Sequence, residues 1–213
     1  MRFAMRYKLF SCLGVCLILT ISSLSVLHEK MSKADVENLI PLPLVKQSTE
    51  YTCGAAAVLS ILKYFGDETL EAELVKQLGT NSNYGTDYRQ MVQFFQSKGF
   101  QITAHAGMSM SELQEHISQG KPVLCLIQAW ESGIQDYSDY WGIGHYVVAI
   151  GYDAERIYLM DPWMLGNYAY IPKKEFISRW HQLTYDNIHL NQWGMALSKG
   201  KSNYDPEAIL YAP

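Results

Sequence analysis

Residues 53–65 are apolar on almost every side of a helical projection, and Gly66 then ends the pattern. A helix of this kind lies buried inside a domain, because a helix on the surface keeps a polar face. Later in the chain Ser109 is followed three residues on by Glu112, the spacing of a capping box at a helix start. The pattern therefore predicts one buried helix and three others, at 68–78, 86–98 and 109–120.

The second half of the chain changes to short apolar runs with the spacing of strands. Residues 146–150 and 157–160 flank a turn segment centred on Asp153 and predict a β-hairpin. Helices first and an antiparallel sheet afterwards are typical of the α+β class, not of alternating βαβ units. We therefore expect two packed halves with a cleft between them. Further strands are predicted at 123–129, 168–171 and 193–197.

The amino-terminal segment 1–27 differs from the rest. Three basic residues precede an uncharged apolar run of 19 residues at 9–27. This is typical of an export signal, and 19 apolar residues also suffice to cross a bilayer, so a cleaved signal peptide and a retained membrane anchor both stay open. In either case the positive-inside rule predicts an exported body, periplasmic or extracellular. A polar linker at 28–40 then leads to one folded domain at 41–213.

Composition and charge narrow the function classes. Hydrophobic residues make up 48% of the chain, which is typical of a globular protein, and 17 basic against 21 acidic residues leave a net charge of −4. Nucleic acids favour basic surfaces, so we expect no nucleic-acid partner. The histidines lack metal-ligand spacing and no lysine follows a glycine-rich phosphate loop. We therefore expect no metal, no cofactor and no ATP.

Cys53 is the first candidate for chemistry. It stands at the first turn of the buried helix, where the helix dipole favours a thiolate. A buried cysteine is more often a small hydrophobic residue, so Cys53 alone is weak evidence. Gln47 strengthens it, because a glutamine amide six residues upstream could form an oxyanion hole with the backbone N–H of Cys53. Gly54 would then allow close approach of a substrate.

His145 and Asp161 are the second candidate. In a hairpin centred on Asp153 the two residues lie directly opposite each other, with Cβ atoms about 4.5–5.5 Å apart on one face. The expectation depends on register, since a slip of one residue moves a side chain to the other face. A carboxylate beside an imidazole orients the ring and holds its tautomer, as a general base requires. Taken singly, His145 could instead cap a strand and Asp161 a turn.

With these residues in place, the chain resembles the papain-like cysteine peptidases that process bacteriocin leader peptides after a double glycine, together with their stand-alone relatives. The resemblance covers about residues 41–181. Each motif is short, but their order and spacing are specific. The motifs are Gln47, Cys53-Gly54-Ala55-Ala56, Lys63-Tyr64-Phe65-Gly66, Gly120-Lys121-Pro122, Gly144-His145-Tyr146-Val147-Val148, Gly151-Tyr152-Asp153, Asp161-Pro162, Gly166, Phe176 and Trp180.

The resemblance implies a papain-like fold, in which a central helix carrying the nucleophile packs on an antiparallel sheet. It implies that Cys53 is the nucleophile, His145 the base and Asp161 the residue that orients the base. Gln47 would be the oxyanion residue, and the reaction would hydrolyse a peptide bond in a peptide or protein substrate.

The best-known members are cytosolic domains of ABC transporters, whereas this chain carries an export segment and no ATPase motif. Specificity for a double glycine is therefore not carried over. Two alternatives stay open: a cell-wall peptide amidase or transpeptidase with the same triad, and a non-catalytic binding module of the same fold.

Overall fold

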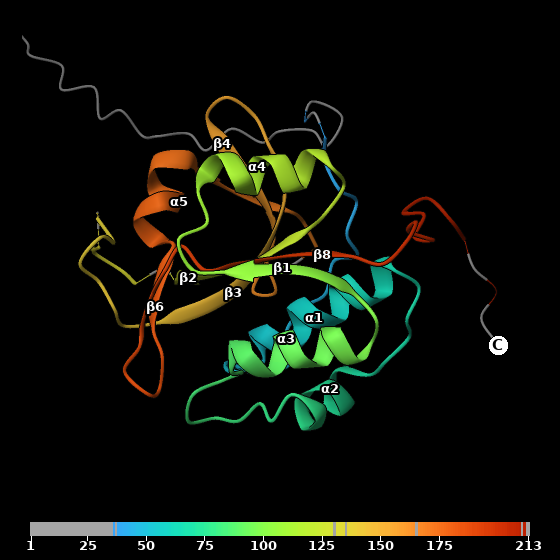
Figure 1. The fold of residues 1–213 in the computed structure, drawn as a ribbon, viewed down its shortest axis with the longest axis horizontal. Helices are drawn as coiled ribbons and strands as arrows, with labels where there is room; N and C mark the ends of the chain where they lie inside the picture. The colour runs from blue at the N-terminus through green and yellow to red at the C-terminus, as the bar shows by residue number, and fades with distance from the viewer. Residues whose placement is uncertain are drawn as a thin grey trace, which may run out of the picture. The chain divides into compact units, whose positions relative to one another are not determined.

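The computed structural model describes residues 36, 38–129, 131–134, 136–164, 166–209 and 211. The candidate export segment at 1–27 and most of the linker at 28–40 lie outside these residues. Among the helices that the structure describes, none combines the length and the apolar character needed to cross a membrane. The folded unit is thus built from the part of the chain that the sequence assigns to a single domain (Figure 1).

Helices form where the apolar pattern predicts them. Within the described residues they are α1 (Cys53–Tyr64), α2 (Glu71–Gln77), α3 (Tyr88–Ser97), α4 (Met110–Ser118) and α5 (Lys173–Arg179). The capping box of α4 is formed, because the Ser109 hydroxyl accepts the Glu112 N–H at 3.2 Å and the Glu112 carboxylate accepts the Ser109 N–H at 2.7 Å. The sequence pattern does not predict α5.

The strands are β1 (Gln101–His105), β2 (Val123–Gln128), β3 (Gly144–Tyr152), β4 (Arg156–Met160), β5 (Ala169–Pro172), β6 (His181–Leu183), β7 (His189–Asn191) and β8 (Gly194–Ser198). Six of these described strands form one antiparallel sheet in the order β1-β8-β2-β3-β4-β5, and β6 pairs with β7 as a separate hairpin. A helical half followed by an antiparallel sheet confirms the predicted α+β class. The sequence pattern misses β1, β6 and β7.

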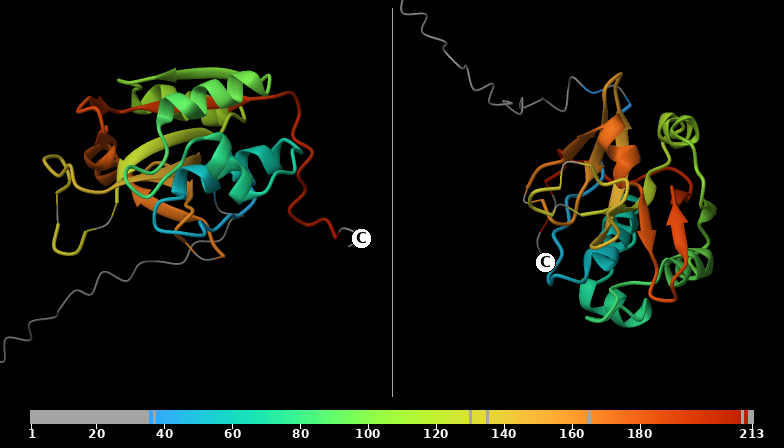
Figure 2. Two further views of the ribbon diagram at one scale, coloured as in Figure 1. Left: turned by 90° about the horizontal axis from the view of Figure 1, so that it is seen from below. Right: turned by 90° about the vertical axis from the view of Figure 1, so that its left-hand side faces the viewer.

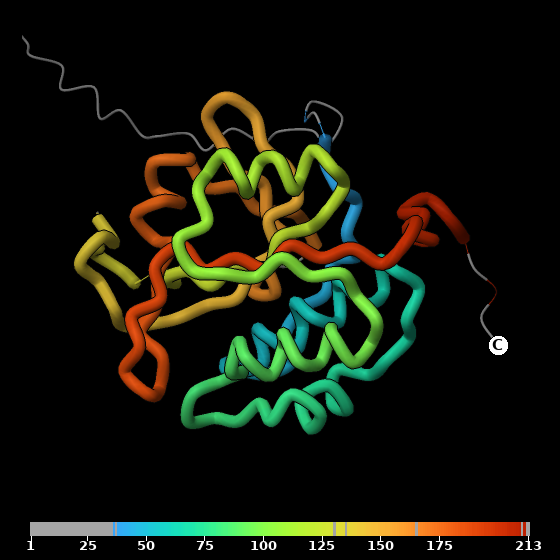
Figure 3. Tube along the Cα trace, viewed as in Figure 1, coloured from blue at the N-terminus to red at the C-terminus, as the bar shows by residue number. Residues whose placement is uncertain are grey.

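Helices cover both faces of the sheet. Figure 1 shows α1, α2 and α3 on one side of the central strands and α4 on the other. Because of this, β2 is buried at every position and β3 at all but its two ends, as their continuous apolar runs require. Figure 3 follows the extended segment that leads into α1, and the backbone N–H of Ile40 there donates to the carbonyl of Ile150 in β3 at 2.7 Å.

The β6–β7 hairpin projects beyond the sheet toward the start of α3 (Figures 1 and 2). Two contacts near its tip hold it there. The guanidinium of Arg89 in α3 lies 2.8 Å from the Asp186 carboxylate, and the rings of Tyr84 and Tyr185 stack with centroids 4.7 Å apart. Side-chain contacts therefore join the tip of the hairpin to the loop before α3 and to the start of α3.

The register of the β3–β4 hairpin differs from the prediction. Val148 pairs with Met160, so the position opposite His145 by extension is 163, and the expected direct pairing with Asp161 is wrong. The turn is centred after Asp153, whose N–H donates to the Arg156 carbonyl at 3.2 Å, and a β-bulge follows between Ala149 and Gly151. The turn moves the register by three residues from the prediction and the bulge moves it back by one, so the net shift is two residues. Asp161 therefore stays on the face of His145 as its diagonal neighbour.

Candidate active site

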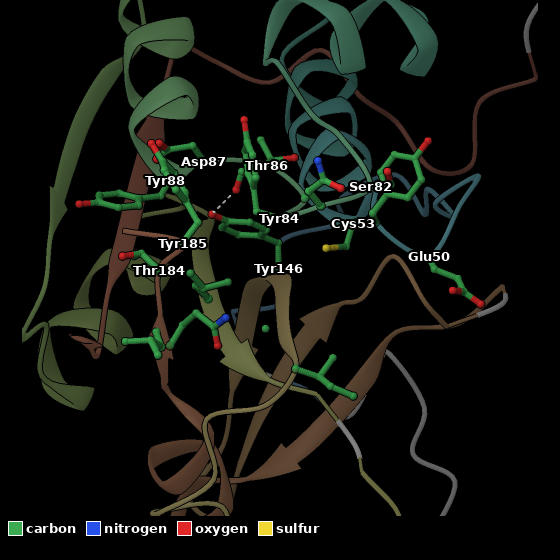
Figure 4. Close-up of a pocket in the computed structure, with 18 of the residues that line it drawn as sticks. Glu50, Cys53, Ser82, Tyr84, Thr86, Asp87, Tyr88, Tyr146, Thr184 and Tyr185 are labelled. Carbon is green, nitrogen blue, oxygen red and sulfur yellow. Dashed lines mark hydrogen bonds between the residues drawn. The ribbon is translucent and has the colours of Figure 1, made fainter. Parts of the chain in front are cut away.

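Cys53 is the first residue of α1 and its thiol is almost completely buried. A tight turn sets up the helix start: the Thr49 N–H donates to the Thr52 hydroxyl at 3.1 Å, directly before Cys53. The helix continues for 12 residues through the core, and its positive end lies at the thiol. Figure 4 shows the sulfur pointing toward Tyr146, whose hydroxyl donates to the Thr86 carbonyl at 3.0 Å.

His145 and Asp161 lie together beneath the surface. Nε2 of His145 is 2.7 Å from Oδ1 of Asp161, and both side chains are buried. The same carboxylate oxygen accepts the Trp163 N–H at 2.8 Å, which holds the turn after Pro162. The imidazole also forms a hydrogen bond with the Cys53 thiol, and Nδ1 is the atom that faces it because Nε2 is engaged. The three side chains thus form one chain of hydrogen bonds.

The ionisation of the pair follows from these contacts. Burial raises the pKa of the Cys53 thiol, but the hydrogen bond and charge of His145, together with backbone hydrogen bonds at Tyr146 and Gly54, bring that pKa below its ordinary value. Burial lowers the pKa of His145, whereas its hydrogen bonds to Asp161 and Cys53 raise it, with a net rise to about 9. Both shifts therefore favour a thiolate beside an imidazolium over the neutral pair.

Gln47 is buried beside the same turn. Its backbone N–H donates to the Pro162 carbonyl at 3.0 Å, which ties the residue to the segment that follows Asp161. One hydrogen of its side-chain amide goes to the Thr49 carbonyl at 2.7 Å. Its Oε1 is buried and has no hydrogen-bond partner among the described residues. The structure thus places the Gln47 amide between the segments that carry Cys53 and Asp161.

Gly54 serves a purpose other than the expected one. A Cβ atom at this position would lie 2.6 Å from Oγ1 of Thr86 and 2.4 Å from Cε of Met91. The expectation that Gly54 leaves room for a substrate is therefore wrong, because the protein's own side chains fill that space. Thr86 is held in turn by a 2.7 Å hydrogen bond between its hydroxyl and that of Thr80.

A pocket of about 460 Å³ opens at Cys53 (Figure 4). One wall comes from the loop that precedes α3, and the other from the start of β3 together with β6 and the hairpin tip. Its charged lining residues are Glu50 and Asp87, so the opening is weakly acidic. The residues that line these two walls include Tyr84, Thr86, Gly144, Gln182, Leu183 and Tyr185. The Cys53 thiol thus lies in the lining of a pocket that could hold a ligand.

Gln182, which lines this pocket, and Gln128, which contacts Gln182, are absent from the candidates that the sequence suggests. Gln128 is fully buried at the end of β2, and Gln182 lies in the three-residue strand β6. A single glutamine at the end of an apolar strand carries no motif. The packing of β6 against the end of β2 brings them together, and that contact is not readable from local sequence.

In the described stretches, His, Cys, Asp and Glu do not gather in groups of three or more that could hold an ion. Cys125 is the other cysteine of the folded part, and complete burial raises the pKa of its thiol far above its ordinary value. It lies in β2 as the sequence pattern predicts and acts as an apolar core residue.

The chain is similar in sequence to a known protein family and to two archaeal proteins. Residues 39–188 match the family model described as "Peptidase_C39 like family". A relative from Methanothermobacter marburgensis, an uncharacterised protein, is 30% identical over 122 residues, which is 57% of this chain and 72% of the relative. One from Methanothermobacter thermautotrophicus is 28% identical over 137 residues, 64% of this chain and 80% of the relative.

Solved structures share the fold. A C39-like peptidase from Bacillus anthracis superposes with a TM-score of 0.58 at 17% identity, covering 78% of this chain and 98% of the other. The peptidase domain of Streptococcus ComA, a bifunctional ABC transporter, gives 0.54 at 20% identity over 73% and 96%. A double-glycine-motif protease from an AMS/PCAT transporter, solved with its leader peptide, gives 0.52 at 16% identity over 75% and 92%. The predicted papain-like fold is thereby confirmed.

Proposed function

Since the chain belongs to the Peptidase_C39-like family, we propose that it is a cysteine peptidase with Cys53 as nucleophile, His145 as base and Asp161 as orienting residue. The observation that carries the proposal is the buried hydrogen-bond chain, in which Asp161 lies 2.7 Å from His145 and the imidazole bonds the thiol. A binding module has no use for an ionised thiol in a pocket, so the geometry favours catalysis over binding alone.

The reaction follows from the ionisation of the pair. The Cys53 thiolate attacks the carbonyl carbon of a peptide bond, and the His145 imidazolium gives its proton to the leaving amine as the C–N bond breaks. A thioester is left on the sulfur. Water then attacks this thioester while His145 takes one of its protons. The C–S bond breaks, the carboxylic acid is released, and the thiolate–imidazolium pair is regenerated. Asp161 holds the ring with one nitrogen toward the sulfur throughout.

Gln47 and the helix start stabilise the oxyanion in this proposal. The developing negative charge lies at the positive end of α1, within reach of the Cys53 backbone N–H. The amide nitrogen of Gln47 carries two hydrogens, of which one goes to the Thr49 carbonyl at 2.7 Å. The other is the donor that we assign to the oxyanion. Together they would supply two donors for the developing charge.

The substrate class is a peptide or an unfolded protein segment. The relative solved with a leader peptide is a double-glycine-motif protease, which supports a peptide ligand for the shared fold. We do not extend the double-glycine requirement to this chain. The pocket has acidic and aromatic lining residues, among them Glu50, Tyr84 and Tyr185, and the proposed occupant is a main chain in extended form.

Export is a separate proposal that rests on residues 1–27 alone, with their basic start and 19-residue apolar run. In intact cells we expect an added protease to reach the folded domain from the outer side of the cytoplasmic membrane. Recovery of the full-length chain in the cytosol, with no membrane association, would refute export. That result would leave the peptidase proposal untouched.

The test of the catalytic proposal is labelling by iodoacetamide followed by mass spectrometry. Cys53 should react below pH 8, where an ordinary thiol is mostly protonated, and Cys125 should stay unmodified in the folded protein. Cys53→Ala should abolish hydrolysis of a fluorogenic peptide library and leave the far-UV spectrum unchanged, since alanine suits a helix. The matched control, Cys125→Ala, should keep activity. Hydrolysis that survives in Cys53→Ala would end the cysteine-peptidase proposal.

A further inference from the structure

The amide of Gln182 is held in one orientation at the pocket wall. Nε2 of the buried Gln128 donates to the His181 carbonyl at 2.9 Å and to Oε1 of Gln182 at 2.5 Å. Burying an amide is costly unless it is hydrogen-bonded, so these contacts offset part of the cost of burying Gln128, whose Oε1 has no partner among the described residues. They also decide which side of the Gln182 amide faces the sheet.

The donor side of Gln182 therefore faces the other way, beside the candidate catalytic histidine. A Cβ atom on Gly144 would lie 2.5 Å from Nε2 of Gln182, so this amide fills the space that the glycine leaves. Gly144 directly precedes His145, and Gly144, Gln182 and Cys53 all line the same pocket. Within the part of the chain that the structure describes, none of the hydrogen bonds uses the Nε2 hydrogens of Gln182. They are therefore left as donors in the wall of the pocket that also contains Cys53.

The backbone of β6 also indicates a ligand that forms main-chain hydrogen bonds. Hydrogen bonds flank the β6–β7 pair on both sides: the Thr184 N–H donates to the Ile188 carbonyl at 3.0 Å, and the Gln192 N–H donates to the Trp180 carbonyl at 2.7 Å. By alternation, the even-numbered position of β6, Gln182, bonds to β7. In an antiparallel pair the alternate positions turn their N–H and C=O groups outward. The His181 carbonyl accordingly meets Gln128, and the peptide group of Leu183 faces away from β7 where Leu183 lines the pocket.

From this geometry we infer that Gln182 is a substrate-positioning residue, whose Nε2 donates a hydrogen bond to a main-chain carbonyl of a peptide lying beside β6. The inference rests on the proposed peptidase function and adds to it the group that holds the substrate backbone. A main-chain carbonyl is present at every residue of a peptide, so this contact selects an extended chain rather than a particular side chain.

The test compares two alkylating agents that carry the same reactive group. Acetyl-Ala-Ala-Ala chloromethyl ketone offers peptide carbonyls to the pocket, whereas chloroacetone offers the reactive group alone. In the wild type the peptidyl reagent should inactivate Cys53 faster than chloroacetone. Gln182→Glu keeps an acceptor for Gln128 but loses the donor, and it should raise the KI of the peptidyl reagent by about 3- to 10-fold, the usual worth of one hydrogen bond.

Controls separate positioning from structure and charge. Gln182→Met removes the donor without adding charge and should give the same rise in KI, with chloroacetone rates within about twofold of wild type. Asn191→Asp places a similar charge on the same hairpin outside this pocket and should leave KI unchanged. A wild type with no preference for the peptidyl reagent, or unchanged KI in both Gln182 variants, would overturn the inference. Failure of chloroacetone to label Cys53 would instead refute the proposed function.

Discussion

Replacing the carboxylate of Asp161 should change the pH range in which the thiol-imidazole pair is ionised. The rise of the His145 pKa from 6.5 to about 9 corresponds to about 3 kcal/mol in favour of the imidazolium, shared between Asp161 and Cys53. A hydrogen bond to a charged acceptor is worth about 1.5–3 kcal/mol and one to a neutral acceptor about 1 kcal/mol, so removing the charge alone should cost about 1–2 kcal/mol, or roughly tenfold in rate. Asp161→Asn should lose about that much, because its amide oxygen can still accept from His145.

Asp161→Ala should lose far more, roughly 10²- to 10³-fold. It removes the acceptor of both the His145 ring and the Trp163 N–H, which lie 2.7 and 2.8 Å from the same oxygen, and leaves a small cavity in a buried site. The ring then loses its orientation as well as its charge partner. A cysteine nucleophile ionises before substrate binds, so a correctly oriented but less basic histidine retains part of the rate.

The assay is a pH profile of kcat/KM on a fluorogenic peptide. In the wild type, activity should rise as Cys53 loses its proton, at a pH below that of an ordinary thiol, and fall as His145 loses its proton near pH 9. In Asp161→Asn both limbs should move inward, because a less stable imidazolium lowers the pKa of the ring and raises that of the thiol. The pH range in which the variant is active should therefore be narrower at both its acidic and its basic end.

A matched control is Asp153→Asn, which alters a carboxylate that accepts two backbone N–H groups in the β3–β4 turn, away from the pocket. It should leave the profile unchanged. Near-UV circular dichroism checks that all variants stay folded. Near-wild-type profiles for both Asp161 variants would refute the reasoning, since Asp161 would then merely hold the turn at Pro162.

Three further predictions follow from the same geometry. Gln47→Ala should lower kcat by roughly 10²–10³-fold with little change in KM, the usual cost of one oxyanion donor; a loss confined to KM would make Gln47 a binding residue. Gly54→Ala should lower the free energy of unfolding by about 1–3 kcal/mol in urea titrations, since its Cβ would lie 2.6 Å from Oγ1 of Thr86; unchanged stability would contradict that contact. Cys125→Ala should cost about 1–2 kcal/mol through lost packing, and a rise in stability would argue against its place in a well-packed core.

Several elements follow from the sequence because their causes are local. The helix α1 is apolar on all sides, and the start of α4 is set by Ser109 and Glu112, whose reciprocal hydrogen bonds need only neighbouring residues. By contrast, β1 alternates polar and apolar residues over only five positions, with Ile102 as its one large apolar side chain, and β6 and β7 have three residues each, too few for a pattern. They form because β8 and the loop before α3 offer them partners, which local sequence does not reveal. The amide contact between Gln128 and Gln182 depends on the same long-range pairing.

The contact between His145 and Asp161 shows most clearly what local sequence determines and what tertiary structure determines. The sequence determined that the two residues lie on neighbouring strands of one hairpin, but not the register. At the turn Tyr152 pairs with Ile157, and a ladder continued from there would set Asp161 opposite Val148, which faces away from His145.

The bulge at Ile150 changes the register by one residue and so returns Asp161 to the face of His145. Its cause lies far from the hairpin in sequence. The Ile150 carbonyl accepts the Ile40 N–H at 2.7 Å, and a Cβ on Gly151 would lie 3.0 Å from Cδ1 of Leu39. The residue types of the site were thus readable from the sequence alone. Their meeting on one face was decided by the tertiary structure, because the packing of the segment before α1 against β3 determines the register.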